Sequence, residues 1–257
     1  MILEADVGIG IAGKEGMQAS LASDFSIVEF GYLRNLILWH GRLSYKRSAV
    51  LSQFVIHRGM IISVIQAIFI ILFYFVSIPI YNGFLMLGYS TIYTSLPVFS
   101  LVFDEDTSLD AALKFPPLYR TLQRGRYLNF KTFCIWVWKS IFQGSVIIML
   151  SILLFNDSYA NIVTITFSSL IVIELLNVYT QINNLSFQML LIQIATGVVY
   201  FMSIVLLQEY FDTSYIDSVF FVKIGIITMI TWAPLHLIYW ISERCDPSEH
   251  KKILLDE

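Results

Sequence analysis

The amino-acid sequence predicts an all-α polytopic membrane protein with six transmembrane helices and a small α/β portion at the N-terminus. Hydrophobic residues make up 57% of the 257 residues and charged residues only 14%, and the mean hydropathy is +0.72. An ordinary soluble domain of this length does not have such a composition. The charged residues are also gathered between long apolar stretches, whereas a helix needs only about 20 apolar residues to span a bilayer.

The first 28 residues differ from the rest of the chain. Ala5 to Ile11 alternates small and branched apolar residues, as a buried strand does. Gly13 to Gly16 predicts a turn, and the apolar spacing from Met17 to Val28 predicts a helix. The glycines of this segment lack the spacing of a dinucleotide- or phosphate-binding loop. A second short helix is expected from Phe30 to His40, ended by Gly41.

A long helix is predicted from about Arg42 to about Val76, since no proline interrupts this stretch. It begins with the basic pair Lys46-Arg47 and ends in the nearly unbroken apolar run from Met60 to Val76. Its length is about 50 Å, compared with about 30 Å for the hydrocarbon core of a bilayer. The helix is therefore expected to cross the membrane and to extend beyond it on its basic side.

Six apolar stretches are long enough to span a membrane, and Pro97 inside the second predicts a kink there. Pro79 and Asn82-Gly83 predict a tight turn before this second span. The chain accordingly divides into an N-terminal part (1–41), a membrane domain (42–241) and a short charged tail (242–257). The predicted spans are residues 48–77, 84–103, 132–155, 160–180, 187–208 and 218–241.

The distribution of Lys and Arg predicts the orientation. Those outside the spans fall in the N-terminal region, in the loop from Asp104 to Lys131 and in the tail. The connections near Asn82, at Asn156-Asp157 and from Glu209 to Asp217 contain none. Because positively charged loops stay on the cytosolic side, both termini are expected in the cytosol.

Several segments resemble a known enzyme family. The string from Met1 to Ile11, followed by Gly13 to Ala19, is similar to the end of the phosphorylation domain of P-type ATPases. Ala22 to Ile27 and Leu36 to Arg42 resemble the type IV subfamily, the phospholipid flippases. Gln53 to Gly59 resembles the Golgi and endosomal flippases that work without an accessory glycoprotein subunit. The resemblance continues to about Glu243.

The resemblance implies that residues 1–41 are the C-terminal remnant of the phosphorylation domain with a linker helix. In the family, a Gly-Asp-Gly-x-Asn-Asp motif that holds the catalytic Mg²⁺ comes directly before this segment, and the chain begins just past it. The phosphorylated Asp-Lys-Thr-Gly-Thr site has no counterpart in this sequence. ATP and Mg²⁺ are therefore expected to act in the parent enzyme, with no catalytic residue in this chain and neither cofactor bound by it. No His, Cys or carboxylate cluster has metal-ligand spacing.

The function implied is that of the membrane half of an ATP-driven phospholipid translocase. It would move an aminophospholipid, phosphatidylethanolamine or phosphatidylserine, from the lumenal or exoplasmic leaflet to the cytosolic leaflet of a Golgi, trans-Golgi or endosomal membrane. Its partners would be the membrane, the lipid and the missing N-terminal part of the ATPase, with no nucleic acid and no required accessory glycoprotein. The alternative is a non-catalytic truncated scaffold or partner-binding protein. A cation pump would concentrate carboxylates in these spans, where Glu174 is the only one.

Four residues are candidates for the substrate path: Arg58, Ser90, Thr94 and Glu174. Arg58 begins an apolar run, where it either snorkels to the interface or, as the resemblance implies from a transport-critical Lys at the matching place, lies beside the lipid. Glu174 lies in mid-span, either functional or neutral and hydrogen-bonded to Asn177 or a neighbouring helix. Ser90 and Thr94 lie near the Pro97 kink and either face a polar groove or bond to their own helix.

Overall fold

A computed structural model describes residues 4–13, 18–115, 118–119, 122, 127–154, 159–184, 186–207, 211 and 217–245. The chain forms two compact units. The first combines Met1–Lys46 with Glu105–Arg126, and the second combines Arg47–Asp104 with Tyr127–Glu257. Most of the predicted charged tail (246–257) and the predicted connection at Asn156-Asp157 lie outside the described residues.

The N-terminal segment of the first unit contains a two-stranded parallel sheet. Strand β1 (Ile9–Ile11) pairs with β2 (Phe25–Ile27), and the short helix α1 (Gln18–Leu21) lies between them in the chain. The strand predicted at the N-terminus is confirmed in its second half. The helix predicted from Met17 to Val28 is confirmed only over α1. Beyond it the prediction is wrong: the Asp24 carboxylate accepts the Gly8 N–H at 2.7 Å, and the next residues form β2.

A continuous helical run follows from Phe30 to Leu72. It consists of the 3₁₀ turn η2 (Phe30–Tyr32), α2 (Leu33–Asn35), the π-helical turn η3 (Leu36–Gly41) and α3 (Arg42–Leu72). The prediction that Gly41 ends a separate helix is wrong: the Arg42 N–H still bonds to the Trp39 carbonyl. A helical glycine costs only about 1 kcal/mol relative to alanine, which a long helix tolerates.

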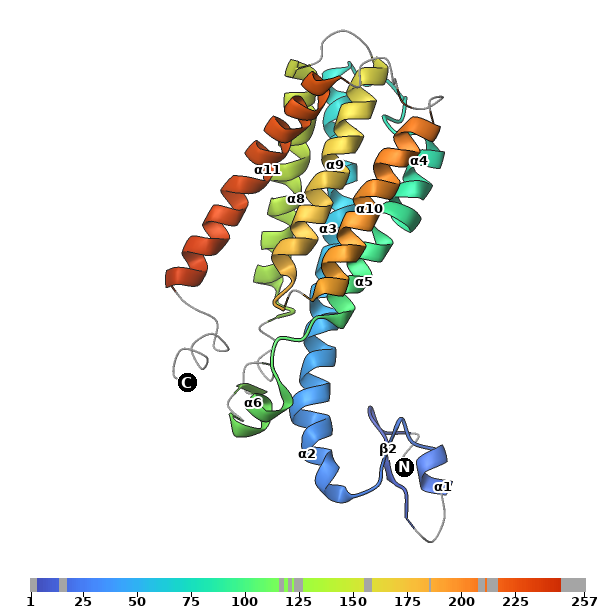
Figure 1. The fold of residues 1–257 in the computed structure, drawn as a ribbon, viewed down its shortest axis with the longest axis vertical. Helices are drawn as coiled ribbons and strands as arrows, with labels where there is room; N and C mark the ends of the chain where they lie inside the picture. The colour runs from blue at the N-terminus through green and yellow to red at the C-terminus, as the bar shows by residue number, and fades with distance from the viewer. Residues whose placement is uncertain are drawn as a thin grey trace. The chain divides into compact units, whose positions relative to one another are not determined.

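Six helices among the described residues are long and apolar enough to span a membrane, which confirms the predicted number. They are α3, the broken helix α4–η4–α5 (Gly83–Gly88, Tyr89–Tyr93 and Ser95–Phe103), α8 (Phe130–Leu154), α9 (Tyr159–Gln181), α10 (Phe187–Leu206) and α11 (Ser218–Cys245). In the second unit, α9 packs against α5, α8, α10 and α11 and is the most deeply buried span (Figure 1).

Helix α3 ends at Leu72, four residues earlier than predicted. Tyr74 and Phe75 have φ angles of 55° and 61°. The N–H of Phe75 bonds to the Ile70 carbonyl at 2.8 Å, which closes the helix in a left-handed turn usually formed with glycine. The apolar character of these residues hides the turn in the sequence.

The second span is interrupted at Thr94, three residues before Pro97. The ring of a helical proline crowds the carbonyl four residues earlier, here that of Tyr93. The residues before the break form the π-helical turn η4. Two hydroxyls take up carbonyls of this turn: Thr94 donates to Tyr89 and Ser95 donates to Ser90, each at 2.6 Å. The predicted interruption is confirmed, and these side chains make it stable in an apolar setting.

Helix α8 lies close to α3 at Gly144. A β-carbon at this position would lie 2.9 Å from Cγ1 of Val64 and 3.1 Å from the Ile61 carbonyl oxygen. Glycine is therefore required for the backbones to come this close, as small residues allow between membrane helices.

Candidate functional site

The guanidinium of Arg58 is bound by a hydroxyl. Its Nη1 donates to Thr94 Oγ1 at 2.6 Å, and the Thr94 hydroxyl donates in turn to the Tyr89 carbonyl. The Arg58 side chain also extends over the Tyr89 ring, with Cζ 6.0 Å from the ring centre. No carboxylate of the described residues lies within 4.0 Å of this guanidinium. Arg58 is half-buried, and the printed contacts of its guanidinium are with the uncharged side chains of Thr94 and Tyr89.

Glu174 lies behind Tyr89, and only 2% of the residue is exposed. The Tyr89 hydroxyl is 3.4 Å from Glu174 Oε1 and 3.5 Å from the Arg58 carbonyl oxygen. Because a phenol has one proton, it can donate fully to only one of these acceptors. Glu174 Oε2 has no hydrogen-bond partner among the described residues. Tyr89 therefore separates a cation from a carboxylate.

One turn further along α9, Asn177 joins a second buried polar cluster. Asn177 and Gln143 pair through their amides at 3.0 and 3.2 Å. The Asn177 amide nitrogen also lies 3.3 Å from His57 Nε2, and His57 Nδ1 lies 2.6 Å from Ser140 Oγ. The amide donates to Nε2 and the Ser140 hydroxyl donates to the Trp136 carbonyl, so the contacts fit a neutral imidazole with its proton on Nδ1. This cluster fixes α3 against α8 and α9.

The structure brings three of the four candidates together. Arg58, Thr94 and Glu174 meet around Tyr89. Ser90 does not join them: it is exposed, and its hydroxyl donates to the Leu87 carbonyl of its own helix at 3.1 Å. Tyr89 was missed by sequence reasoning, because tyrosine is common in this chain and its orientation depends on the π-helical turn.

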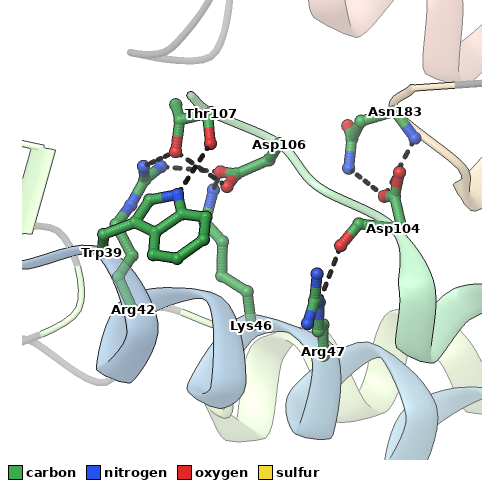
Figure 2. A network of polar contacts seen from close by, with 8 residues as sticks. All are labelled: Trp39, Arg42, Lys46, Arg47, Asp104, Asp106, Thr107 and Asn183. Carbon is green, nitrogen blue, oxygen red and sulfur yellow. Dashed lines mark hydrogen bonds and ion pairs between the residues drawn. The ribbon is translucent and has the colours of Figure 1, made fainter. Parts of the chain in front are cut away.

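A different cluster lies at the start of α3, within the first unit (Figure 2). Arg42, which is 2% exposed, donates to Thr107 Oγ1 at 2.6 Å and to Asp106 Oδ2 at 2.7 Å. Lys46 also pairs with Asp106, and the Trp39 indole N–H donates to the Thr107 carbonyl at 3.2 Å. Burial acts to raise the pKa of Asp106, but Lys46 and Arg42 outweigh it and hold that pKa below its ordinary value. The cluster attaches the segment after α5 to the start of α3.

Asp104 has a corresponding role in the second unit. Its carboxylate accepts the backbone N–H groups of Asn183 and Asn184 at 3.0 Å each and the Asn183 amide at 2.9 Å. Arg47 Nε donates to the Asp104 carbonyl at 2.7 Å (Figure 2). These bonds fix the connection between α9 and α10.

The described residues do not form a metal centre: none of their His, Cys, Asp and Glu side chains gather in groups of three or more that could hold an ion. The part of the chain that the structure describes therefore gives no fit for the Mg²⁺ of a phosphoryl-transfer site.

Comparison with known proteins agrees with this architecture. Residues 20–244 match the family described as "Phospholipid-translocating P-type ATPase C-terminal". The chain is 48% identical over 254 residues to "Probable phospholipid-transporting ATPase IIB" of Danio rerio, which covers 98% of this chain and 23% of that protein. The human protein of the same name is 44% identical over 265 residues, covering 98% and 23%. "Phospholipid-transporting ATPase NEO1" of Saccharomyces cerevisiae is 44% identical over 257 residues, covering 98% and 22%.

The chain thus spans less than a quarter of the length of these relatives. The family match covers all six apolar helices and most of the first unit. This chain belongs to the phospholipid-translocating P-type ATPases and corresponds to the C-terminal membrane part of the proteins in the group that includes ATPase IIB and NEO1.

Proposed function

We propose that this chain is the membrane half of an ATP-driven flippase and that Arg58 contacts the phosphate of the lipid as it crosses the bilayer. The cargo is an aminophospholipid, phosphatidylethanolamine or phosphatidylserine, moved from the lumenal or exoplasmic to the cytosolic leaflet. The rest of the enzyme contains the aspartate that is phosphorylated and binds ATP and Mg²⁺. The protein acts in Golgi or endosomal membranes with both termini in the cytosol, without an accessory glycoprotein.

The observation that supports this proposal is the set of partners around Arg58. A guanidinium is costly within a membrane span unless it is compensated. Here it is bound to the neutral hydroxyl of Thr94, so a phosphate can replace that partner without breaking an ion pair. A guanidinium can hold two phosphate oxygens in a bidentate arrangement, which makes Arg58 suited to a phospholipid head group.

The contact belongs to a step after phosphorylation, because the ATP site is formed elsewhere in the enzyme. Losing Arg58 should therefore slow lipid-stimulated dephosphorylation while the phosphoenzyme still forms. A hydrogen bond to a charged group contributes about 1.5–3 kcal/mol, which corresponds to a roughly tenfold or larger loss of rate.

The test uses the full-length translocase with Arg58→Ala and Arg58→Lys, and measures the lipid-dependent ATPase rate per phosphoenzyme. Lys should restore part of the rate, since it keeps the charge without the planar fork. Arg244→Ala is the matched control, because Arg244 lies at the end of α11 over the Trp240 ring, with Cζ 4.7 Å from its centre. Equal normalised rates in all variants would reduce Arg58 to an interfacial anchor. A protein without lipid-dependent ATPase activity would instead favour the alternative of a non-catalytic scaffold.

A further inference from the structure

The Glu174 carboxyl is a buried acidic group with few hydrogen-bond donors. It is 2% exposed, Oε1 accepts a single long bond from Tyr89, and Oε2 accepts none from the described residues. An ionised carboxylate in such a place is unfavourable unless a positive charge or several donors compensate it. Whether this carboxyl is ionised or protonated therefore depends on the cations near it.

Two cations act on Glu174 without closing an ion pair. They are Lys139 on α8 and Arg58 on α3. The Lys139 ammonium lies over the Trp136 ring, 4.9 Å from its centre, and Arg58 is bound to Thr94. Neither is within 4.0 Å of the carboxylate in the described structure. Neither cation therefore neutralises the carboxylate through a direct contact.

Among the described residues, the remaining helices that pack on α9 contribute no further charge near Glu174. Helix α5 has no titratable side chain, and the only one on α10, Tyr200, is bonded to Ser168 at 2.7 Å. On α11, Lys223 donates to the Leu154 carbonyl, and His236 stacks on Trp232. The other titratable groups of α11 lie in its last two turns, Tyr239 to Cys245. His57 on α3 is held by Ser140 and Asn177.

We infer that Glu174 is a proton-binding site that takes up one proton when a lipid phosphate binds Arg58 and releases it when the lipid leaves. This rests on the proposed contact between Arg58 and the phosphate. A bound phosphate cancels the field of Arg58, so the carboxylate loses the charge that favours its ionised form. One O–H bond then forms on the carboxylate as one O–H bond of a solvent hydronium ion breaks, which leaves a water molecule. The proton offsets the charge that the phosphate adds, which keeps the net charge of the buried cluster constant.

Thermodynamic linkage makes this measurable. If lipid binding takes up one proton, the affinity for lipid falls as the pH rises, by up to about tenfold for each pH unit. In the full-length translocase, the lipid concentration for half-maximal ATPase stimulation should therefore rise between about pH 6 and about pH 9. The rates are normalised to phosphoenzyme at each pH. Phosphatidylethanolamine in detergent micelles is the probe.

Glu174→Gln should make this concentration independent of pH and close to the wild-type value at the acid end, because glutamine resembles the protonated carboxyl in shape and charge. Glu174→Asp keeps a titratable group and should retain the pH dependence. Glu243→Gln, near the end of α11, is the matched control and should behave as wild type.

Two results would overturn the inference. One is a Glu174→Gln enzyme with the wild-type pH dependence. The other is a Glu174→Gln enzyme that forms phosphoenzyme but does not respond to lipid at any pH, which would show that the ionised carboxylate is required. The proposed function fails separately, through wild-type behaviour of Arg58→Ala. The two proposals can also be separated by a third result. If Arg58→Ala loses its response to lipid but the lipid affinity of the wild type does not change with pH, the proposed function stands and the proton site at Glu174 is refuted.

Discussion

Arg58 Nη1 and Thr94 Oγ1 lie 2.6 Å apart, so this guanidinium is bonded to an uncharged oxygen. A neutral hydrogen bond contributes about 0.5–1.5 kcal/mol, far less than the free energy needed to separate a buried ion pair. The guanidinium can therefore exchange this partner for another oxygen at low cost. Thr94 serves both as this partner and as the donor that satisfies the Tyr89 carbonyl.

Thr94→Val should destabilise the protein by about 1–3 kcal/mol, because it leaves the Tyr89 carbonyl unsatisfied in an apolar setting and deprives Arg58 of its acceptor. Thr94→Ser keeps the hydroxyl and should cost much less. The measurement is thermal unfolding in detergent micelles. Equal midpoints for the two variants would mean that the hydroxyl does not support the broken helix.

Gly144→Ala should separate α8 from α3, because the added β-carbon would overlap Val64 and the Ile61 carbonyl. Such overpacking costs about 1–3 kcal/mol. Gly225→Ala in α11 is the matched control: a β-carbon there meets no atom within 4 Å. The control should be neutral or slightly stabilising, since alanine favours helix. A Gly144→Ala protein as stable as the Gly225→Ala protein would contradict the close contact.

Asp106→Asn should leave the buried charge of Arg42 without its counter-ion and destabilise the first unit by about 3 kcal/mol. The stability of the wild-type protein should depend on pH for the same reason. Since the pKa of Asp106 in the folded protein is lower than its ordinary value of 3.8, its stabilising effect is complete above that value. It is lost as the pH falls through the lower native pKa.

Unfolding midpoints measured from about pH 6 down to about pH 3 should thus decrease less in Asp106→Asn than in the wild type. Asp110→Asn, on an exposed position of α6 (Leu109–Lys114), provides the comparison and should retain the wild-type decrease. Parallel curves for all three proteins would rule out Asp106 as the source of the acid sensitivity.

The orientation of the spans predicts that Ser77 and Ser108 lie on opposite sides of the membrane, because Lys and Arg are gathered on the side of Ser108. Both serines are exposed. Single cysteines at these positions, in a protein whose two exposed natural cysteines are replaced by alanine, should react differently with a membrane-impermeant thiol reagent on sealed vesicles. Labelling of both from the same side would refute the six-span topology.

The number and approximate limits of the apolar helices follow from the sequence, because hydropathy depends on each residue's own side chain. Hydropathy does not indicate which residues of neighbouring helices face one another. The pairing of His57 with Asn177 and the position of Tyr89 between Arg58 and Glu174 arise only when α3, η4 and α9 are packed together. The helix expected up to Val28 ends at Leu21 for a related reason, since the Asp24 carboxylate bonds to Gly8 sixteen residues earlier.

In the candidate site, too, some residues could be predicted from the sequence and others depend on packing. Arg58 and Glu174 were found because charges are rare in membrane spans and each one needs an explanation. Ser90 and Thr94 were equivalent in the sequence, and their distinction depends on the π-helical turn, which directs Thr94 toward Arg58 and leaves Ser90 exposed. The position of such a turn results from the proline that follows it and from hydroxyls that satisfy its carbonyls.

The surroundings of Trp136 give this membrane domain an intrinsic optical reporter. Its ring lies 5.3 Å from that of His57, and the Lys139 ammonium is 4.9 Å from its centre. The emission wavelength of an indole shifts when a charge beside the ring changes or moves. The emission wavelength of Trp136 should therefore report changes in the charges around it. The chain has five tryptophans, and a variant that retains only Trp136 would allow the transport cycle to be followed by fluorescence without an attached dye.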